Sequence, residues 1–403
     1  MPLNFIVYIL MALSAAIVQP VHASTESLKY QLQQLNIGNE TYQVKIPVGY
    51  QLEFLSKSMS GPRLLTFALN GDLFAGSKSG NVYRIPSPYT QPEILLNTDG
   101  YPHNVAFRAN KIFVAKTDGV YSADYKAGQK IISAQALKRI AALPAGYGHN
   151  SRTVATGPDQ RIYVSLGVAG NCSDQYLGQG YNFNDQRGGV LVLNEKNAVA
   201  GWQPYASGLR NPVGFDWHPQ TKIMYASNNG PDHHGFEQPR EYFSRLTPGS
   251  FHGMPWYQMQ GDKLVRDTCV NSNSPRAMEE VAKPVASFPA RSAPMAVAFI
   301  NKQLRDEKLQ GDAVVALHGS WGTKPTGSAS GDRATRRHPK LVLVRFDKGK
   351  AVRVDDLVSG FQLASGKRWA RPVGVAIGPE GAIYFTSDAG INGLFRLRLM
   401  TNN

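Results

Sequence analysis

Short runs of apolar and β-branched residues recur along the chain, and each is followed by a turn rich in glycine, proline, asparagine or aspartate. Each recurrence pairs a strand of apolar and small residues with a second strand of β-branched and aromatic residues. The pair occurs six times, at residues 65–68 with 72–75, 105–107 with 111–114, 153–155 with 161–164, 213–215 with 222–225, 297–299 with 312–315, and 373–376 with 381–384. Alternating apolar and polar positions joined by tight turns predict antiparallel sheets, and helical periodicity is rare.

A third strand follows several of these pairs, at residues 81–85, 189–193, 341–344 and 393–397. Radial repetition of small sheets protects their edges, so the pattern predicts an all-β fold, a six-bladed β-propeller. Dividing the 380 residues after position 23 among six repeats gives about 63 each, against roughly 40–50 in common propellers. Long insertions between strands are therefore expected. A β-sandwich or a β-helix is the alternative.

The first 23 residues are typical of an export signal. An apolar run over residues 5–18, too short to span a bilayer comfortably, precedes a small-residue cleavage site at residues 21–23. An uncleaved membrane anchor is the alternative. The pattern predicts that residues 24–403 form a single propeller domain in the periplasm or outside the cell, without an integral membrane span.

Composition supports a folded, exported protein. Hydrophobic residues make up 42% of the chain, enough to bury a sizeable core, and 43 basic against 29 acidic residues give a net charge of +14. Export and the lack of any nucleic-acid-reading motif argue against a nucleic-acid partner. The basic run at residues 333–338 lies in a glycine- and serine-rich insertion and is interpreted as a solvated loop.

The two cysteines, Cys172 and Cys269, fit an oxidising compartment. An even pair there predicts one disulfide joining two long loops, and two buried free thiols are the alternative. A metal site built on them is not expected, because the sequence shows no CxxC spacing and no histidine cluster beside either cysteine.

Polar residues stand just before the first strand of several repeats. In a propeller these strands line the central channel, so the residues before them converge on one face. They are His103 and Asn104, residues 149–152, Arg210 and Asn211, and Arg371. Clustered cations at a channel mouth predict a site for an anionic ligand.

These residues resemble the soluble pyrroloquinoline quinone (PQQ)-dependent glucose/sorbosone dehydrogenases. The similarity covers most of the chain after residue 23 and is strongest between residues 148 and 257. The motifs that carry it are Gly-His-Asn-Ser-Arg at 148–152, Gly-Leu-Arg-Asn-Pro at 208–212, Asn-Gly-Pro-Asp at 229–232 and Phe-His-Gly-Met-Pro-Trp at 251–256. His-Gly-Ser-Trp at 318–321 and Arg-Pro-Val-Gly at 371–374 are similar to the sorbosone-type, aldose sugar dehydrogenase-like branch.

The resemblance implies an enzyme that oxidises a sugar or sugar aldehyde by hydride transfer to bound PQQ. It makes His149 the general base that takes the hydroxyl proton, a role that suits a neutral imidazole. Arg210 and Asn211 would hold the quinone oxygens, with Arg210 stabilising the charge that develops. His103, at an equivalent position of the repeat, is a second candidate for the base and for contact with the cofactor.

The resemblance also implies Ca²⁺ as a second cofactor. The backbone carbonyls of Gly230 and Pro231 would bind it, and the ion would polarise the quinone. Arg371 would pair with a cofactor carboxylate, and Lys324 could act similarly. Asp232 corresponds to an acidic position near the metal loop. An external electron acceptor would reoxidise the cofactor.

The sequence departs from the family at two places. Val168 stands where the glucose-oxidising branch has an acidic residue, so the group that would orient the base is missing unless Asp174 or Asp185 replaces it. The insertion at 168–187 is expected to shape the substrate mouth. His233 and His234 stand where the family tends to be acidic, and they are interpreted as surface residues, with a place beside the metal as the alternative.

Two other functions remain open. A Ca²⁺-dependent propeller lactonase would need side-chain carboxylate ligands at the axis, where this chain carries mostly histidine, arginine and asparagine. A non-catalytic propeller that binds a sugar or a protein is the second alternative, which Val168 keeps open.

Overall fold

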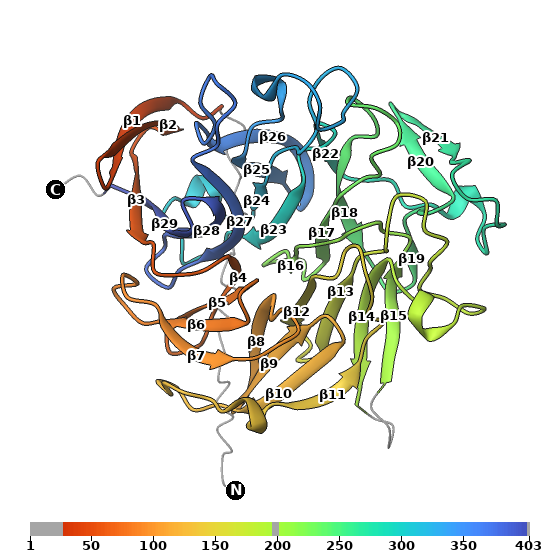
Figure 1. The fold of residues 1–403 in the computed structure, drawn as a ribbon, viewed down its shortest axis with the longest axis horizontal. Helices are drawn as coiled ribbons and strands as arrows, with labels where there is room; N and C mark the ends of the chain where they lie inside the picture. Colours follow the sequence, from red (N-terminus) through yellow and green to blue (C-terminus); the bar gives the residue numbers. More distant parts are fainter. Residues whose placement is uncertain (1–26, 196–200, 401–403) are drawn as a thin grey trace, which may run out of the picture.

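The computed structural model describes residues 27–195 and 201–400, and these residues fold mainly into β-strands. Six small antiparallel sheets radiate from a common axis (Figure 1), so the predicted six-bladed β-propeller is confirmed. The described residues contain no α-helix. Their 3₁₀ helices are η1 (Ala134–Ala136), η2 (Phe183–Asp185), η3 (Met278–Glu280), η4 (Glu307–Leu309) and η5 (Arg333–Thr335). The export signal predicted over residues 1–23 lies outside the described residues.

Each of the first three blades begins with the strand nearest the axis and proceeds outward. Blade 1 contains β4 (Pro62–Phe67), β5 (Leu73–Ser77), β6 (Asn81–Ile85) and β7 (Glu93–Asn97). Blade 2 contains β8 (Asn104–Arg108), β9 (Lys111–Lys116), β10 (Gly119–Asp124) and β11 (Lys138–Ala142). Blade 3 contains β12 (Arg152–Thr156), β13 (Ile162–Leu166), β14 (Gly189–Asn194) and β15 (Gly201–Ser207), with the short β19 (Ser250–Phe251) added in parallel to β15.

The other three blades follow the same plan. Blade 4 contains β16 (Phe215–Trp217), β17 (Met224–Asn228), β18 (Glu241–Leu246) and β22 (Ala286–Phe288). Blade 5 contains β23 (Pro294–Phe299), β24 (Ala313–Leu317), β25 (Lys340–Asp347) and β26 (Lys350–Val358). Blade 6 contains β27 (Ala370–Ile377), β28 (Ile383–Gly390), β29 (Gly393–Leu399) and β3 (Tyr50–Ser56). Two hairpins lie outside the blades, β1 (Tyr30–Ile37) with β2 (Glu40–Pro47) and β20 (Tyr257–Gln260) with β21 (Lys263–Arg266).

All six predicted strand pairs occur as the two inner strands of a blade. In blade 4 the second strand begins at Met224, two residues later than predicted. Lys222 has a φ of 57°, a left-handed conformation that belongs to the turn and cannot continue a strand.

The ring closes by pairing an N-terminal strand with a C-terminal one. In blade 6, β3 is the outer strand and runs antiparallel to β29, with Leu52 opposite Leu397 and Phe54 opposite Phe395. This pairing joins the N-terminal and C-terminal strands in one blade and so closes the ring.

The hydrophobic core lies largely between neighbouring blades. One cluster joins Tyr163 and Val190 of blade 3 to Phe215 and Met224 of blade 4. Along the axis, a cavity of about 370 Å³ is lined mainly by apolar and small residues of the inner strands. The polar groups that could carry chemistry gather at one mouth of this axis.

Candidate active site

The antiparallel order of each blade brings two kinds of segment to the same face. The first strand begins where the second strand ends, as the pairing of Arg152 with Leu166 and of Asn104 with Ala115 shows. The face therefore collects the residues before each inner strand together with the residues after each second strand. The repeat pattern in the sequence predicted this convergence only for the first set, whereas Gly230 and Pro231 of the second set were indicated by the family resemblance.

Hydrogen bonds connect the six blades at this face into a continuous ring. Each bond joins a group near the start of an inner strand, or the end of a second strand, to the next blade. In order around the axis they are Leu64 N to His103 O (3.4 Å), His103 Nδ1 with Thr153 Oγ1 (3.2 Å), Thr153 Oγ1 to Val213 O (2.5 Å), Asn229 Nδ2 to Pro294 O (2.8 Å), Arg371 Nε to His318 O (2.9 Å) and Thr386 Oγ1 to Arg63 O (2.6 Å). The ring fixes the mutual positions of the predicted site residues before any ligand binds.

The His149 imidazole is held in one tautomer. Its Nδ1 lies 2.6 Å from the carbonyl oxygen of Val168, which can only accept a hydrogen bond, so Nδ1 carries the proton and donates it. The lone pair of Nε2 is left available to take a proton. Burial and the nearby charge of Arg210 lower the pKa of His149 to about 4, so the ring is neutral near pH 7.

The backbone of Val168 therefore orients His149, which the apolar side chain of Val168 cannot do. Its carbonyl accepts from His149, and its N–H donates to the carbonyl of Arg210 at 2.8 Å, so one peptide segment links both residues. The acidic residues of the insertion do not replace it. Asp174 accepts from Tyr181, and Asp185 accepts from Gln175.

Two glycines allow His149 to approach this segment. Gly148 has a φ of 84°, and a Cβ there would collide with the backbone of Ala169. A Cβ on Gly167 would collide with the side chains of His149 and Asn211. The same contacts place the side chains of His149 and Asn211 together against Gly167.

Two buried arginines lie beneath His149. Arg152 and Arg187 are 0% and 1% exposed, and both donate to the His149 carbonyl. Their other guanidinium hydrogen bonds go to backbone carbonyls, and no ion pair joins either of them to a carboxylate within the described chain. These charges help to lower the pKa of His149 and favour an anionic ligand nearby.

Arg210 and the insertion form the next part of the site. The Nη2 of Arg210 donates to Asn171 Oδ1 at 2.7 Å and lies 3.4 Å from an Asp232 carboxylate oxygen. Asp232 also pairs with Arg291 at 2.9 Å, and its N–H donates to Asn171. Asn171 thus brings the predicted insertion into the mouth. Burial lowers the pKa of Arg210, although Asp232 opposes the effect.

The predicted metal loop lies beside a buried carboxylate. Gly230 N–H donates to Glu241 at 2.5 Å, and burial raises the pKa of Glu241 to about 7. Neither the Gly230 nor the Pro231 carbonyl accepts a hydrogen bond from any residue within 27–195 or 201–400. Free carbonyl oxygens with a nearby carboxylate are the donor set that a hard cation such as Ca²⁺ prefers, so these residues fit the ion.

The opposite side of the mouth is built around Asp388. Its buried carboxylate is 2.6 Å from both Arg63 and His318 Nε2, and 2.8 Å from Lys78. Burial opposes ionisation, yet the hydrogen bond from His318 and the charges of Arg63 and Lys78 hold the pKa of Asp388 well below its usual range. Arg371 lies next to this group, and its guanidinium donates to the carbonyls of His318 and Gly319.

His103 lies between the two sides. It is fully buried, and burial together with the charge of Arg63 lowers its pKa well below the usual value. Thr153 gives its hydroxyl proton to Val213 and so accepts from His103 Nδ1. Buried atoms here without a partner in the described structure include His103 Nε2, Arg63 Nε and Arg210 Nε. The two unpaired arginine N–H groups and the excess of cations fit a tricarboxylate quinone, whereas the unprotonated Nε2 of His103 can only accept a hydrogen bond.

Lys324 is the one predicted site residue that the structure does not bring to this cluster. Its side chain is 52% exposed, and its ammonium lies 3.6 Å from Glu237 and 5.8 Å above the Phe236 ring. Lys324 therefore packs on the residues between β17 and β18.

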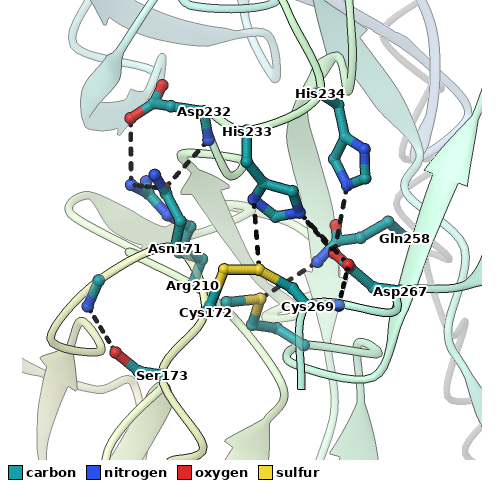
Figure 2. Close-up of a disulfide and its surroundings, with 12 residues drawn as sticks. Asn171, Cys172, Ser173, Arg210, Asp232, His233, His234, Gln258, Asp267 and Cys269 are labelled. Carbon is teal, nitrogen blue, oxygen red and sulfur yellow. Dashed lines mark hydrogen bonds and ion pairs between the residues drawn. A yellow bond between two sulfur atoms is a disulfide. The ribbon is translucent and has the colours of Figure 1, made fainter. Parts of the chain in front are cut away.

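The predicted disulfide between Cys172 and Cys269 is confirmed, with the two Cα atoms 5.2 Å apart. It ties the insertion to the segment after β21, next to Asn171 and Arg210 (Figure 2). The prediction that no histidine lies beside either cysteine holds along the sequence but is wrong in the folded structure. His233 Nδ1 is 3.8 Å from Cys269 Sγ, because the fold brings the loop after β17 onto the disulfide.

Comparison with known protein families assigns the chain to one family. A model of the family described as TrAA12-like matches residues 44–241 and 256–393, which is most of the sequence. The chain belongs to the TrAA12-like family. Members of this family are PQQ-dependent oxidoreductases, so the resemblance found in the motifs is confirmed. One curated relative, an uncharacterized protein of Borreliella burgdorferi, is 24% identical over 89% of this chain and 91% of its own length.

Solved structures share the fold of this TrAA12-like protein at low sequence identity. A Trichoderma reesei enzyme of carbohydrate-active family AA12 superposes with a TM-score of 0.73 at 17% identity, over 88% of this chain and 97% of that one. The PQQ domain of pyranose dehydrogenase from Coprinopsis cinerea gives 0.67 at 18% identity, over 89% and 97%. The apo aldose sugar dehydrogenase of Escherichia coli gives 0.62 at 13% identity, over 87% and 99%.

Several residues of the TrAA12-like site were not predicted from the sequence. Arg291 precedes an inner strand, as His103 does, and Arg63 is the second residue of β4, as Arg371 is of β27. Alignment of all six repeats would have found both Arg291 and Arg63. Lys78 and His318 follow second strands, and Asp388 lies near the end of the second strand β28, so all three meet the same face. Glu241 begins a third strand, and the sequence gives no signal that it turns inward.

The TrAA12-like chain shows no helix, in the part that the structure describes, with the length and apolarity needed to cross a membrane.

Proposed function

We propose that this protein is an exported dehydrogenase that oxidises a sugar or sugar aldehyde with PQQ and Ca²⁺ as cofactors. The observation that carries the proposal is the state of the His149 imidazole, which is neutral and is held by a hydrogen bond to the Val168 carbonyl. The positive charge of the nearby Arg210, together with burial, lowers the pKa of His149. Membership of a family of PQQ-dependent oxidoreductases supports the same chemistry. The disulfide supports an oxidising compartment, the periplasm or the exterior.

His149 would act as the general base. Its Nε2 accepts the proton of the substrate hydroxyl at the carbon to be oxidised, while Nδ1 keeps its hydrogen bond to Val168 and prevents the ring from turning. The low pKa of His149 ensures that the base is unprotonated before substrate binds.

The surrounding cations would bind and orient the cofactor. When bound, PQQ supplies the acceptor for the substrate's hydride, and Ca²⁺ supplies a Lewis acid at the quinone. Arg210 and Asn211 would contact the quinone end, with Gly230 and Pro231 providing carbonyl ligands for the ion. Arg371 and the neighbouring Arg63 would attract the carboxylates, and His103 would line the floor.

Two alternatives are less well supported. A lactonase that activates water on a metal needs carboxylates at the axis that are free to bind it, whereas Asp388 and Asp232 are paired with Arg63 and Arg291. A propeller that only binds a sugar or a protein is disfavoured because His149 is still oriented as a base. The Val168 carbonyl supplies the hydrogen bond that the missing acidic side chain would have made.

The test is a dye-reduction assay. Purified apoprotein would be mixed with Ca²⁺ and PQQ, and reduction of an artificial electron acceptor would be followed across a panel of sugars. The proposal expects turnover that needs both additions and disappears in His149→Ala. Lactone hydrolysis without quinone would favour the lactonase, and sugar binding without turnover would favour the binding protein.

A further inference from the structure

A buried carboxylate lies beneath two adjacent histidines on the loop after β17. Asp267 is 3% exposed, and the imidazoles of His233 and His234 both point their Nε2 atoms at it (Figure 2). The two rings are 4.0 Å apart between centroids. The side chains of His233 and His234 are 25% and 21% exposed, so the group is reachable from solvent.

Asp267 has no permanently charged partner within the described residues. Its only ion-pair partners there are the two histidines, and its Oδ1 also accepts the N–H of Cys269 at 3.0 Å. A carboxylate removed from water needs a cation or a full set of donors. Metal-binding carboxylates are typically steadied by such a second hydrogen bond.

The spacing of the three groups suits a tetrahedral metal. His233 Nε2 and His234 Nε2 each lie 3.2 Å from Asp267 Oδ2, and all three ligand atoms lie within 4.8 Å of one another. Bonds of about 2.0–2.1 Å in a tetrahedral zinc site place neighbouring ligands roughly 3.3 Å apart. Imidazole with carboxylate is also a ligand set that Zn²⁺ accepts.

The surroundings hold these ligands in place. The disulfide Cys172–Cys269 closes one side of the group, and because both sulfurs are bonded to each other, neither is a thiolate ligand. On the other side, Asp232 anchors the histidine loop to Arg291 and lies near Arg210. The histidines are therefore presented by a loop that is fixed at its start.

We propose that His233, His234 and Asp267 bind a divalent transition metal ion of the Zn²⁺ class, with a water molecule completing the tetrahedron. This site is separate from the Gly230 and Pro231 carbonyls, which offer only hard oxygen ligands. The bound ion cross-links the loop after β17 to the segment after β21, and so stiffens the mouth beside Arg210.

The test is metal binding by the full mature protein under non-reducing conditions, with Ca²⁺ in excess. Co²⁺, a spectroscopic substitute for Zn²⁺, would be titrated while visible absorption is followed, and Zn²⁺ would then be added as competitor. The proposal expects one Co²⁺ per chain with a tetrahedral spectrum, displacement by Zn²⁺, and a Zn²⁺-dependent rise in the melting temperature.

Three variants sharpen the test. His234→Ala should weaken Zn²⁺ binding at least 10-fold and remove the thermal shift, and Asp267→Asn should do the same if it folds. His338→Ala, which changes an exposed histidine elsewhere, should bind as the wild type does. Equal binding by wild type and His234→Ala, or Co²⁺ binding that appears only after reduction of the disulfide, would overturn the proposal. None of these readouts depends on PQQ, so the dehydrogenase proposal could fail independently.

Discussion

At the scale of single residues, the proposed catalysis depends on how the His149 imidazole is oriented. The ring receives its orientation from the main-chain carbonyl of Val168, whereas the resemblance assigns this task to an acidic side chain in the glucose-oxidising branch. A carbonyl fixes the tautomer without adding negative charge, so nothing beside the ring raises its pKa strongly, and burial with the nearby arginines lowers it.

Replacing the base should remove catalysis and spare binding. His149→Ala is expected to lower kcat/KM by about 10²–10⁴-fold, because general base catalysis typically contributes that much. The affinity for PQQ should change only a few-fold. Steady-state kinetics with a dye acceptor and a separate PQQ titration would measure the two effects, with His338→Ala as the control. A loss of affinity equal to the loss of rate would mean that His149 binds the cofactor instead.

The pH dependence follows from the lowered pKa of His149. The neutral ring is the active form, so the rate falls only as the pH drops through about 4, whereas an ordinary histidine would lose activity near 6.5. The acid limb of kcat/KM, measured between pH 3.5 and 8 at roughly constant ionic strength, should therefore be flat above about pH 5. An apparent pKa near 6.5 that is retained in His103→Gln would contradict this picture.

At the scale of elements, the site is assembled where inner strands begin and second strands end. The alternation of apolar residues located all six strand pairs, and the polar residues before four inner strands located His149, Arg210 and Arg371. The pairing that brings Asp388 and His318 to the same mouth depends on blade geometry, which alternation does not encode. The inward turn of Glu241 depends on packing within blade 4 and leaves no local pattern.

The close packing around Gly167 gives a prediction at this scale. Gly167→Ala should displace His149 and Asn211 and lower kcat/KM at least 10-fold, since small misplacements of catalytic groups have large effects. Gly170→Ala is the matched control, because a Cβ there would meet only Ser173 Oγ at an ordinary 3.6 Å. Equal activity of the two variants would show that the base does not need this contact.

At the scale of the whole molecule, the ring must close for six separate segments to meet at one mouth. Closure depends on β3 pairing with β29, where Leu52 is 1% exposed. The hydrogen bonds around the mouth run through every blade, so an opened ring would separate Arg63 from Thr386.

Closure can be tested by charging the outer strand. Leu52→Asp buries a carboxylate without a partner and should lower the free energy of unfolding by roughly 3–5 kcal/mol. Val48→Asp, at a position that is 55% exposed, should change it by less than about 0.5 kcal/mol. Urea denaturation would compare the two, and similar midpoints would argue that β3 does not hold the ring.

The central claim is that the cationic mouth binds a tricarboxylate quinone, and calorimetric titration of PQQ into the Ca²⁺-loaded apoprotein tests it most directly. The account predicts one saturable site per chain, weakened at least 10-fold in Arg371→Gln and unchanged in Lys324→Gln, whose ammonium lies on Glu237 and Phe236. Folded wild-type protein that takes up no PQQ, or that binds it equally well without Arg371, would contradict the account.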